Sequence, residues 1–140
     1  MSSLRPFHLA FPVTDLVLAT AFYGDLLGCE KGRESDQWID WSFFGHQVVT
    51  HLVAQMPSAP AYNNVDNHAV PVPHFGVVLT LEDWQVLADN LVAHKVEFVI
   101  EPYTRFKGEV GEQSTLFLLD PFGNALEFKA FADLSSLFAK

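Results

Sequence analysis

The pattern of apolar and polar residues predicts strands and helices in alternation. Along residues 5–13 every second side chain is large and apolar: Phe7, Leu9, Phe11 and Val13. This period of two is typical of a half-buried strand, and it turns His8 away from the apolar face. Thr14 and Asp15 then offer N-cap oxygens to a helix whose apolar residues recur at helical spacing. Gly28 is suited to end that helix.

Three more strands are predicted in the first half of the chain, at residues 29–34, 37–44 and 47–54. The first module, residues 5–54, therefore has the order strand, helix and three strands (βαβββ). Residues 55–72 are rich in proline, asparagine and small side chains. We expect them to form a long connecting loop.

The second half of the chain repeats this order. A strand is predicted at residues 73–79, and the capping-box-like segment 80–83 (TLED) begins a helix that ends near His94. Three further strands are predicted at residues 96–101, 114–119 and 125–131. Residues 73–131 therefore form a second βαβββ module, and the chain has the alternation of an α+β protein.

Composition and charge narrow the class of protein. The 140 residues are 49% hydrophobic and 14% aromatic, which is enough to bury a core. The net charge of −9 is spread over both halves, so neither half has the basic surface expected of a nucleic-acid or membrane-surface protein. Cys29 is the only cysteine, and no apolar run approaches the ~20 residues of a membrane span. We expect a cytoplasmic protein with no intrachain disulfide.

Four potential metal ligands stand at matching places in the two modules. His8 and His74 lie on the first strand of each module, and His51 and Glu127 lie on the last strand. A single histidine in a strand is more often a hydrogen-bonded structural residue than a ligand. The repetition favours a shared metal site, because two imidazoles and a carboxylate suit Fe(II), Mn(II), Co(II) or Zn(II).

A short basic segment is the main candidate for contact with a ligand. Arg105 and Lys107 lie between Pro102 and Gly108, in a stretch that we expect to be a loop over the site. Arg105 is suited to bidentate binding of a carboxylate or phenolate, although both cations also fit a solvated loop. Tyr62 or Tyr103 can close a pocket over a flat aromatic substrate.

Two motifs give the chain a family resemblance. Segment 22–28 (FYGDLLG) follows the first strand, and segment 120–124 (DPFGN) precedes the last one. With these motifs the chain resembles the vicinal oxygen chelate superfamily, which includes glyoxalase I, bleomycin- and fosfomycin-resistance proteins and extradiol dioxygenases. The resemblance runs from Phe7 to Phe131. It implies a single domain over residues 1–140, with eight mostly antiparallel strands in a cupped arrangement.

The resemblance also implies a ligand set and partners. His8, His74 and Glu127 match the superfamily's metal ligands, with Fe2+ or Mn2+ favoured and Zn2+, Ni2+ or Co2+ as other candidates. A small-molecule substrate is implied, with no nucleic-acid or membrane partner. Small members commonly form homodimers, in which each site lies within one chain or is shared by two.

His51 is where the chain departs from many glyoxalase I enzymes, which have a glutamate ligand at this place. An imidazole there suits an extradiol dioxygenase, which needs a group for proton transfer beside three metal ligands. Segments 72–76, 101–108 and 119–128 look most like small bacterial proteins described as predicted extradiol-type dioxygenases. We therefore expect a metal-dependent dioxygenase in which His51 is catalytic and Arg105 and Tyr103 bind the substrate.

Two other functions are compatible with the same residues. In the first, His51 is a fourth ligand and the protein is an isomerase, lyase or thiol transferase. In the second, the fold binds and sequesters a compound without a metal, as the bleomycin-binding members do. The number of protein ligands separates the first alternative from the dioxygenase, and metal analysis identifies the second.

Overall fold

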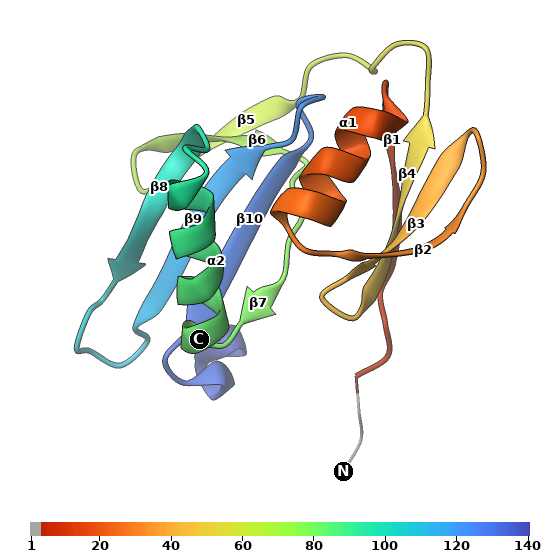
Figure 1. The fold of residues 1–140 in the computed structure, drawn as a ribbon. Coiled ribbons are helices and arrows are strands. Elements are labelled where there is room, and N and C mark those ends of the chain that lie inside the picture. The colour runs from red at the N-terminus through yellow and green to blue at the C-terminus, as the bar shows by residue number, and fades with distance from the viewer. Residues whose placement is uncertain (1–3) are drawn as a thin grey trace. The chain divides into compact units, whose positions relative to one another are not determined.

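The computed structural model describes residues 4–140 and has a mixed α+β fold (Figure 1). The chain divides into two compact units, Met1–Ser58 and Ala59–Lys140. Among the described residues, no helix is long and apolar enough to cross a membrane.

The first unit contains a four-stranded sheet and one helical segment. Its elements are β1 (His8–Val13), α1 (Leu16–Ala19), the π-helical η1 (Thr20–Leu26), β2 (Glu30–Glu34), β3 (Trp38–Phe43) and β4 (His46–Leu52). The sheet order is β1-β4-β3-β2, with β1 parallel to β4 and the other pairs antiparallel. Along the chain these elements follow the order strand, helical segment and three strands.

Local sequence explains where the first helical segment starts and stops. The Asp15 carboxylate accepts hydrogen bonds from the backbone N–H groups of Val17 and Leu18, at 2.8 and 3.0 Å. It therefore acts as the N-cap that the sequence predicts. Gly28 adopts a φ of +74°, the left-handed conformation that glycine favours after a helix. The expected single helix is an α-turn continued by a π-helical stretch.

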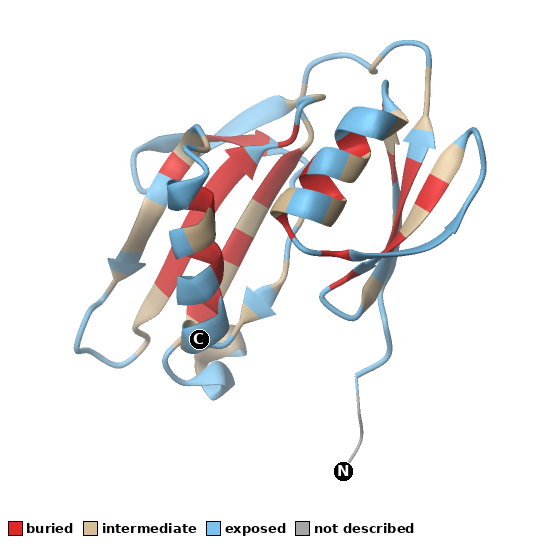
Figure 2. Cartoon of the chain, in the orientation of Figure 1, coloured by how far each residue is buried: buried red, intermediate tan, exposed pale blue. Residues whose placement is uncertain are grey.

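The core of the first unit lies between this helical segment and one face of the sheet (Figure 2). Tyr23 and Trp41 are fully or nearly fully buried, and the Trp41 indole N–H donates to the Thr50 hydroxyl over 3.1 Å. Trp38 lies on the opposite face of β3, as the alternation predicts, and is half-buried.

The second unit contains a hairpin and a second four-stranded sheet. Its elements are β5 (Ala61–Val65), β6 (His68–Val72), β7 (Val78–Leu79), α2 (Leu81–Ala93), β8 (Phe98–Arg105), β9 (Gln113–Leu119), β10 (Ala125–Phe131) and the 3₁₀-helical η2 (Leu134–Phe138). The sheet order is β7-β10-β9-β8, which repeats the order of the first unit. The β5–β6 hairpin forms a separate two-stranded sheet.

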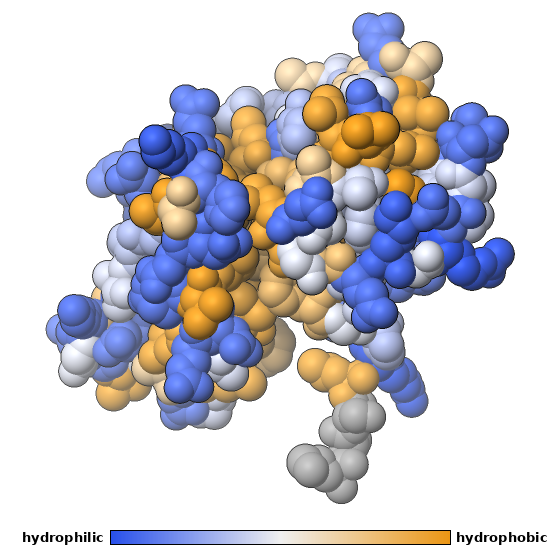
Figure 3. Space-filling view, viewed as in Figure 1, coloured by the Kyte–Doolittle hydropathy of each residue, from blue (hydrophilic) through white to orange (hydrophobic). Residues whose placement is uncertain are grey.

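Helix α2 covers one face of the second sheet. Its buried side chains, Trp84, Leu87, Ala88 and Leu91, occupy one stripe of the helix. The Trp84 indole N–H donates to the backbone oxygen of Phe128 over 3.0 Å, which ties α2 to β10. The outward side of α2 is largely hydrophilic with isolated apolar side chains (Figure 3). The pocket described below lies on the opposite face of this sheet.

Two segments of the second unit differ from the sequence prediction. Residues 61–72, expected to be part of an irregular connection, form the β5–β6 hairpin around a two-residue turn. Strand β8 continues to Arg105, so Tyr103 and Arg105 project from a strand and not from a loop. A register shift between Ile100 and Tyr103 accommodates Pro102, which is why proline does not end the strand.

The strand expected at residues 73–79 is also shorter than its counterpart β1. Only Val78 and Leu79 form β7, and Phe75 makes an isolated bridge to Leu126. Gly76 lies so close to β10 that an added Cβ would overlap the carbonyl oxygen of Glu127. This close approach brings the backbone around His74 against the strand that carries Glu127.

Candidate metal and ligand site

The histidine and the carboxylate predicted as ligands in the second unit lie side by side. His74 Nε2 is 3.4 Å from Glu127 Oε1, and both side chains are partly exposed. Two ligands bound at about 2.1 Å and separated by 90–109° around a metal lie roughly 3.0–3.4 Å apart. The observed spacing therefore fits one edge of a metal coordination shell.

Hydrogen bonding sets the tautomer of His74. Its Nδ1 lies 2.8 Å from the backbone oxygen of Pro71. Since a carbonyl oxygen can only accept, Nδ1 carries the proton and donates it. In the neutral imidazole, Nε2 then has its lone pair on the side of Glu127. An imidazole fixed in this way is the usual form of a histidine ligand.

A hydrogen bond to the second carboxylate oxygen of Glu127 orients this side chain. The Thr115 hydroxyl donates to Glu127 Oε2 over 2.7 Å, which leaves Oε1 on the side of His74. The Phe117 ring packs edge-on against the His74 imidazole, with the ring centroids 4.8 Å apart. His74 and Glu127, the candidate ligands of this unit, are thus both held in place by neighbouring groups, as metal ligands generally are.

A pocket of about 180 Å³ adjoins this pair on the open face of the second sheet. Its apolar walls are Val70, Ile100 and Phe117, and His74, Thr115 and Glu127 form part of its polar lining. A cavity of about 150 Å³ is enough to hold benzene in another protein. The pocket therefore has room for one substituted aromatic ring.

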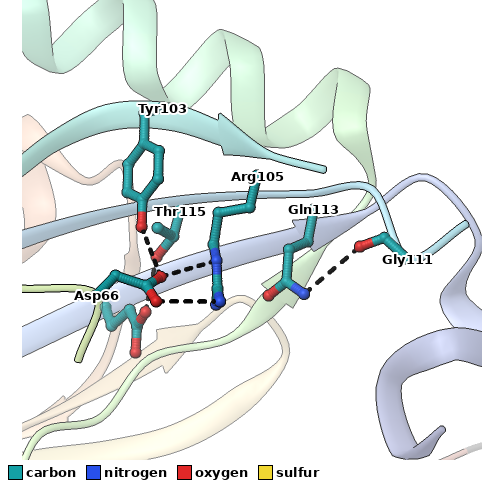
Figure 4. Close-up of polar contacts among 7 residues, drawn as sticks. Asp66, Tyr103, Arg105, Gly111, Gln113 and Thr115 are labelled. Carbon is teal, nitrogen blue, oxygen red and sulfur yellow. Dashed lines mark hydrogen bonds and ion pairs between the residues drawn. The ribbon is translucent and has the colours of Figure 1, made fainter. Parts of the chain in front are cut away.

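A second polar cluster, Arg105, Tyr103 and Asp66, lines the same pocket (Figure 4). Arg105 Nε is 2.8 Å from Asp66 Oδ2, and Arg105 Nη2 donates to Asp66 Oδ1 over 3.3 Å. The Tyr103 hydroxyl donates to Asp66 Oδ2 over 3.2 Å. Burial, followed by the hydrogen bond to Asp66, raises the pKa of Tyr103 above its ordinary value, so its phenol stays a donor.

The histidine predicted as a ligand in the first unit is also held in a defined tautomer. His8 Nδ1 is 2.7 Å from Gln47 Oε1, its neighbour in the β1–β4 register. Because the amide oxygen only accepts, Nδ1 is the protonated nitrogen and Nε2 is left with its lone pair. His8 is exposed, so this lone pair is accessible to a ligand.

His51 does not have the place in its unit that Glu127 has in the other. The residue after His8, Leu9, pairs with Val48, and the residue after His74, Phe75, pairs with Leu126. The residue that corresponds to Glu127 is therefore Val49. The expected correspondence between His51 and Glu127 is wrong by two residues.

The register also places His51 away from His8 within the first unit. His51 pairs with Pro12 on β1 and with Trp38 on β3, four positions beyond the pair of His8 and Gln47. At about 3.3 Å per residue, the two histidines are roughly 13 Å apart along the sheet. Within residues 4–140, no three His, Cys, Asp or Glu side chains form a group that could hold a metal ion.

Two residues of this site, Asp66 and Thr115, were not predicted from the sequence, and Lys107, for which ligand contact and a solvated position were both open, lies outside the pocket. Asp66 was hidden in a segment interpreted as a loop, although Asp-Asn between two runs of alternating residues is typical of a tight hairpin turn. Thr115 had no signal, since a threonine in a strand is ordinary. Lys107 is exposed in the turn beyond β8 and does not line the pocket.

These features define a small α+β protein in which both sheets have the same strand order. The second sheet carries a pocket lined by apolar and polar side chains. The chain belongs to the Glyoxalase/Bleomycin resistance protein/Dioxygenase superfamily, whose family model matches residues 5–128. A search of curated proteins gave no match.

Solved structures agree with the family. A glyoxalase/bleomycin resistance protein/dioxygenase from Alicyclobacillus acidocaldarius is 31% identical, with a TM-score of 0.76 and 96% of each chain covered. The fosfomycin resistance protein FosX from Listeria monocytogenes is 18% identical, with a TM-score of 0.66, covering 96% of this chain and 97% of its own. A glyoxalase/dioxygenase from Nostoc punctiforme is 15% identical, with a TM-score of 0.68, covering 95% and 99%. The last two similarities concern the fold alone.

Proposed function

We propose that the protein is a metal-dependent enzyme of the dioxygenase type, acting on a small, anionic aromatic substrate that chelates the metal. The observation that carries this proposal is the pair His74 and Glu127, spaced as two ligands and open to a pocket that fits one ring. Membership of a superfamily that contains dioxygenases supports it.

The proposed ligands are His74, Glu127 and His8. The first two have the spacing and tautomer described above, and His8 is held by Gln47 with Nε2 available. Two imidazoles and one carboxylate favour Fe2+ or Mn2+, with Zn2+, Ni2+ or Co2+ as alternatives. When bound, such an ion supplies positive charge for two neighbouring substrate oxygens and open positions for further ligands.

Other side chains of the pocket have roles in binding and proton transfer. Arg105 and Tyr103 bind and orient the anionic group of the substrate, and Phe117 and Ile100 enclose its ring. We assign proton transfer to His51. Its separation of roughly 13 Å from His8 along the sheet argues against His51 as a fourth ligand beside His8 of the same unit, but it does not by itself support proton transfer, which needs contact with the substrate.

We also propose that the protein acts as a homodimer. In such a dimer His8 and the pair His74 and Glu127 can come from the same chain or from two chains. A mixture of His8→Ala and Glu127→Ala chains distinguishes these arrangements, because only a shared site leaves one intact site in the mixed dimer. Activity regained on mixing therefore indicates a shared site.

The test of the proposed function is oxygen uptake by protein loaded anaerobically with Fe(II) and mixed with a panel of catechols. We expect oxygen consumption with ring cleavage, lost in Glu127→Gln and retained in Glu101→Gln. Glu101 is a matched control because it is an exposed glutamate on β8 outside the pocket.

Two outcomes would redirect the assignment. Stoichiometric metal binding without oxygen uptake across the panel would exclude the dioxygenase and favour an isomerase, lyase or transferase. Failure to retain any metal after reconstitution would favour a sequestering protein.

A further inference from the structure

The turn of the β5–β6 hairpin places the carboxylate of Asp66 in the lining of the pocket. Asp66 and Asn67 form the two-residue turn and have φ angles of +49° and +67°. Positive φ at both central residues is the mark of a type I′ turn, and aspartate and asparagine tolerate it better than most residues. This turn carries the Asp66 side chain to Arg105 and Tyr103 on β8 (Figure 4).

The donors around Asp66 form a binding site for a carboxylate. Two guanidinium nitrogens of Arg105 and the Tyr103 hydroxyl address its two oxygens, over 2.8, 3.3 and 3.2 Å. This fork of donors is the usual way in which arginine recognises a free carboxylate. Because Asp66, Tyr103 and Arg105 all line the pocket, the same donors face a ligand that enters it.

In the metal-free pocket the formal charges of the lining side chains balance only while Asp66 is in place. Asp66 and Glu127 carry the negative charges, and Arg105 and Lys129 carry the positive ones. If the hairpin tip moves away, the pocket gains one positive charge. A ligand carboxylate at Arg105 restores the balance.

Few residues of the hairpin are buried, which permits this exchange. All five residues of β5 are exposed. On β6 Val70 and Pro71 are buried, and Val70 packs with Ile100, Phe117 and Ala125. Near the tip, the centroid of the His68 ring lies 6.3 Å from that of the Tyr103 ring. A two-stranded hairpin is only marginally stable by itself. The ion pair of Arg105 and Asp66 is itself partly exposed, and such pairs contribute little to stability.

We propose that Asp66 occupies the carboxylate subsite of the pocket and that an aromatic carboxylate binds by displacing it from Arg105 and Tyr103. Asp66 is then a specificity-determining residue, because it admits ligands whose own carboxylate replaces it and disfavours neutral rings. The proposal deepens the proposed function by naming the substrate class, and it rests on the same pocket.

The test uses metal-free protein and benzoate, with the neutral isostere benzamide as a second probe, in calorimetric titrations. We expect Asp66→Asn and Asp66→Gly to bind benzoate at least tenfold more tightly than the unmodified protein. Both replacements tolerate the positive φ of residue 66, so the turn is kept. Arg105→Gln should lose benzoate binding. Glu101→Gln, which changes the net charge by the same amount as Asp66→Asn and Asp66→Gly, should leave benzoate binding unaltered.

Hydrogen exchange of the hairpin provides the second readout. Benzoate should accelerate amide exchange in residues 64–68 of the unmodified protein, because the ligand releases the tip. If Asp66→Asn and Asp66→Gly bind benzoate no better, or if benzoate slows exchange at the tip, Asp66 is a fixed wall and the proposal is wrong. The titrations need neither metal nor oxygen, so they can fail or succeed independently of the dioxygenase assay.

Discussion

The two units have the same sheet order but differ in what lies next to the first-strand histidine. In the first unit His8 lies beside Gln47, on a six-residue strand fully paired with β4. In the second unit His74 precedes a two-residue strand and faces Glu127. One topology therefore supports two kinds of histidine site, one with an amide neighbour and one with a carboxylate neighbour.

The difference arises from backbone contact as well as from ligand type. Gly76 allows the chain after His74 to approach β10, whereas the corresponding residue of the first unit is Ala10. The residue corresponding to Glu127 is the buried Val49. The second unit thus has a carboxylate where the first has an apolar side chain.

Removing the Glu127 carboxylate should have the largest effect, because this carboxylate distinguishes the histidine site of the second unit from that of the first. We expect Glu127→Gln to weaken divalent metal binding by more than about a hundredfold, since even residues that only support a ligand are often worth ten- to hundredfold. Titration with Co(II), followed by its absorption spectrum, measures the loss. Glu101→Gln is the control, and unchanged affinity in Glu127→Gln would remove this residue from the ligand set.

Two substitutions, Gly76→Ala and Ala10→Gly, test whether the close backbone approach at Gly76 distinguishes the two units. Gly76→Ala should lower the free energy of unfolding by about 2 kcal/mol, because the new methyl group overlaps the Glu127 carbonyl. Ala10→Gly should cost only about 0.5–1 kcal/mol, the usual effect of glycine in a strand. Urea denaturation measures the loss in the free energy of unfolding for each variant. Equal losses would show that close approach at Gly76 does not distinguish the units.

The support of the carboxylate can be weakened without removing it. Thr115→Val deletes the hydroxyl that donates to Glu127 but keeps the shape of the side chain. We expect metal affinity to fall by about tenfold, at the lower end of the range for such supporting residues. The same Co(II) titration applies, with Thr104→Val on the neighbouring strand as the matched control.

The smallest effect concerns the pH dependence of the second unit. The pKa of Tyr103 is raised, so its protonated form contributes stability that is fully present below the ordinary value of about 10 and is lost as the pH rises through the folded value. Asp66→Asn should lower this pKa, because the hydrogen bond and charge of Asp66 help to raise it. Absorbance titration, with Tyr103→Phe to identify the signal, measures the shift. A pKa unchanged by Asp66→Asn would mean that burial and the charge of Glu127 are responsible for the shift.

Much of the fold and part of the site could be predicted from local patterns. The alternation in residues 5–13 predicted β1, the turn motif at residues 120–124 preceded the predicted strand that is β10, and the caps at Asp15 and Thr80 placed the helix starts. The hairpin at residues 61–72 escaped prediction because proline and asparagine outweighed its weaker alternation.

Apart from the β5–β6 hairpin and η2, the sequence by itself determined the order of the elements, and it identified His74 and Glu127 as candidate ligands. Strand register was decided only in the tertiary structure, because a shift of two residues leaves every side chain on the same face and so leaves the polarity pattern unchanged. This is why Glu127 could be matched with His51 although its counterpart is Val49. The contact of Asp66 with Arg105 was likewise decided by folding, since 39 residues separate them and no local pattern relates the two.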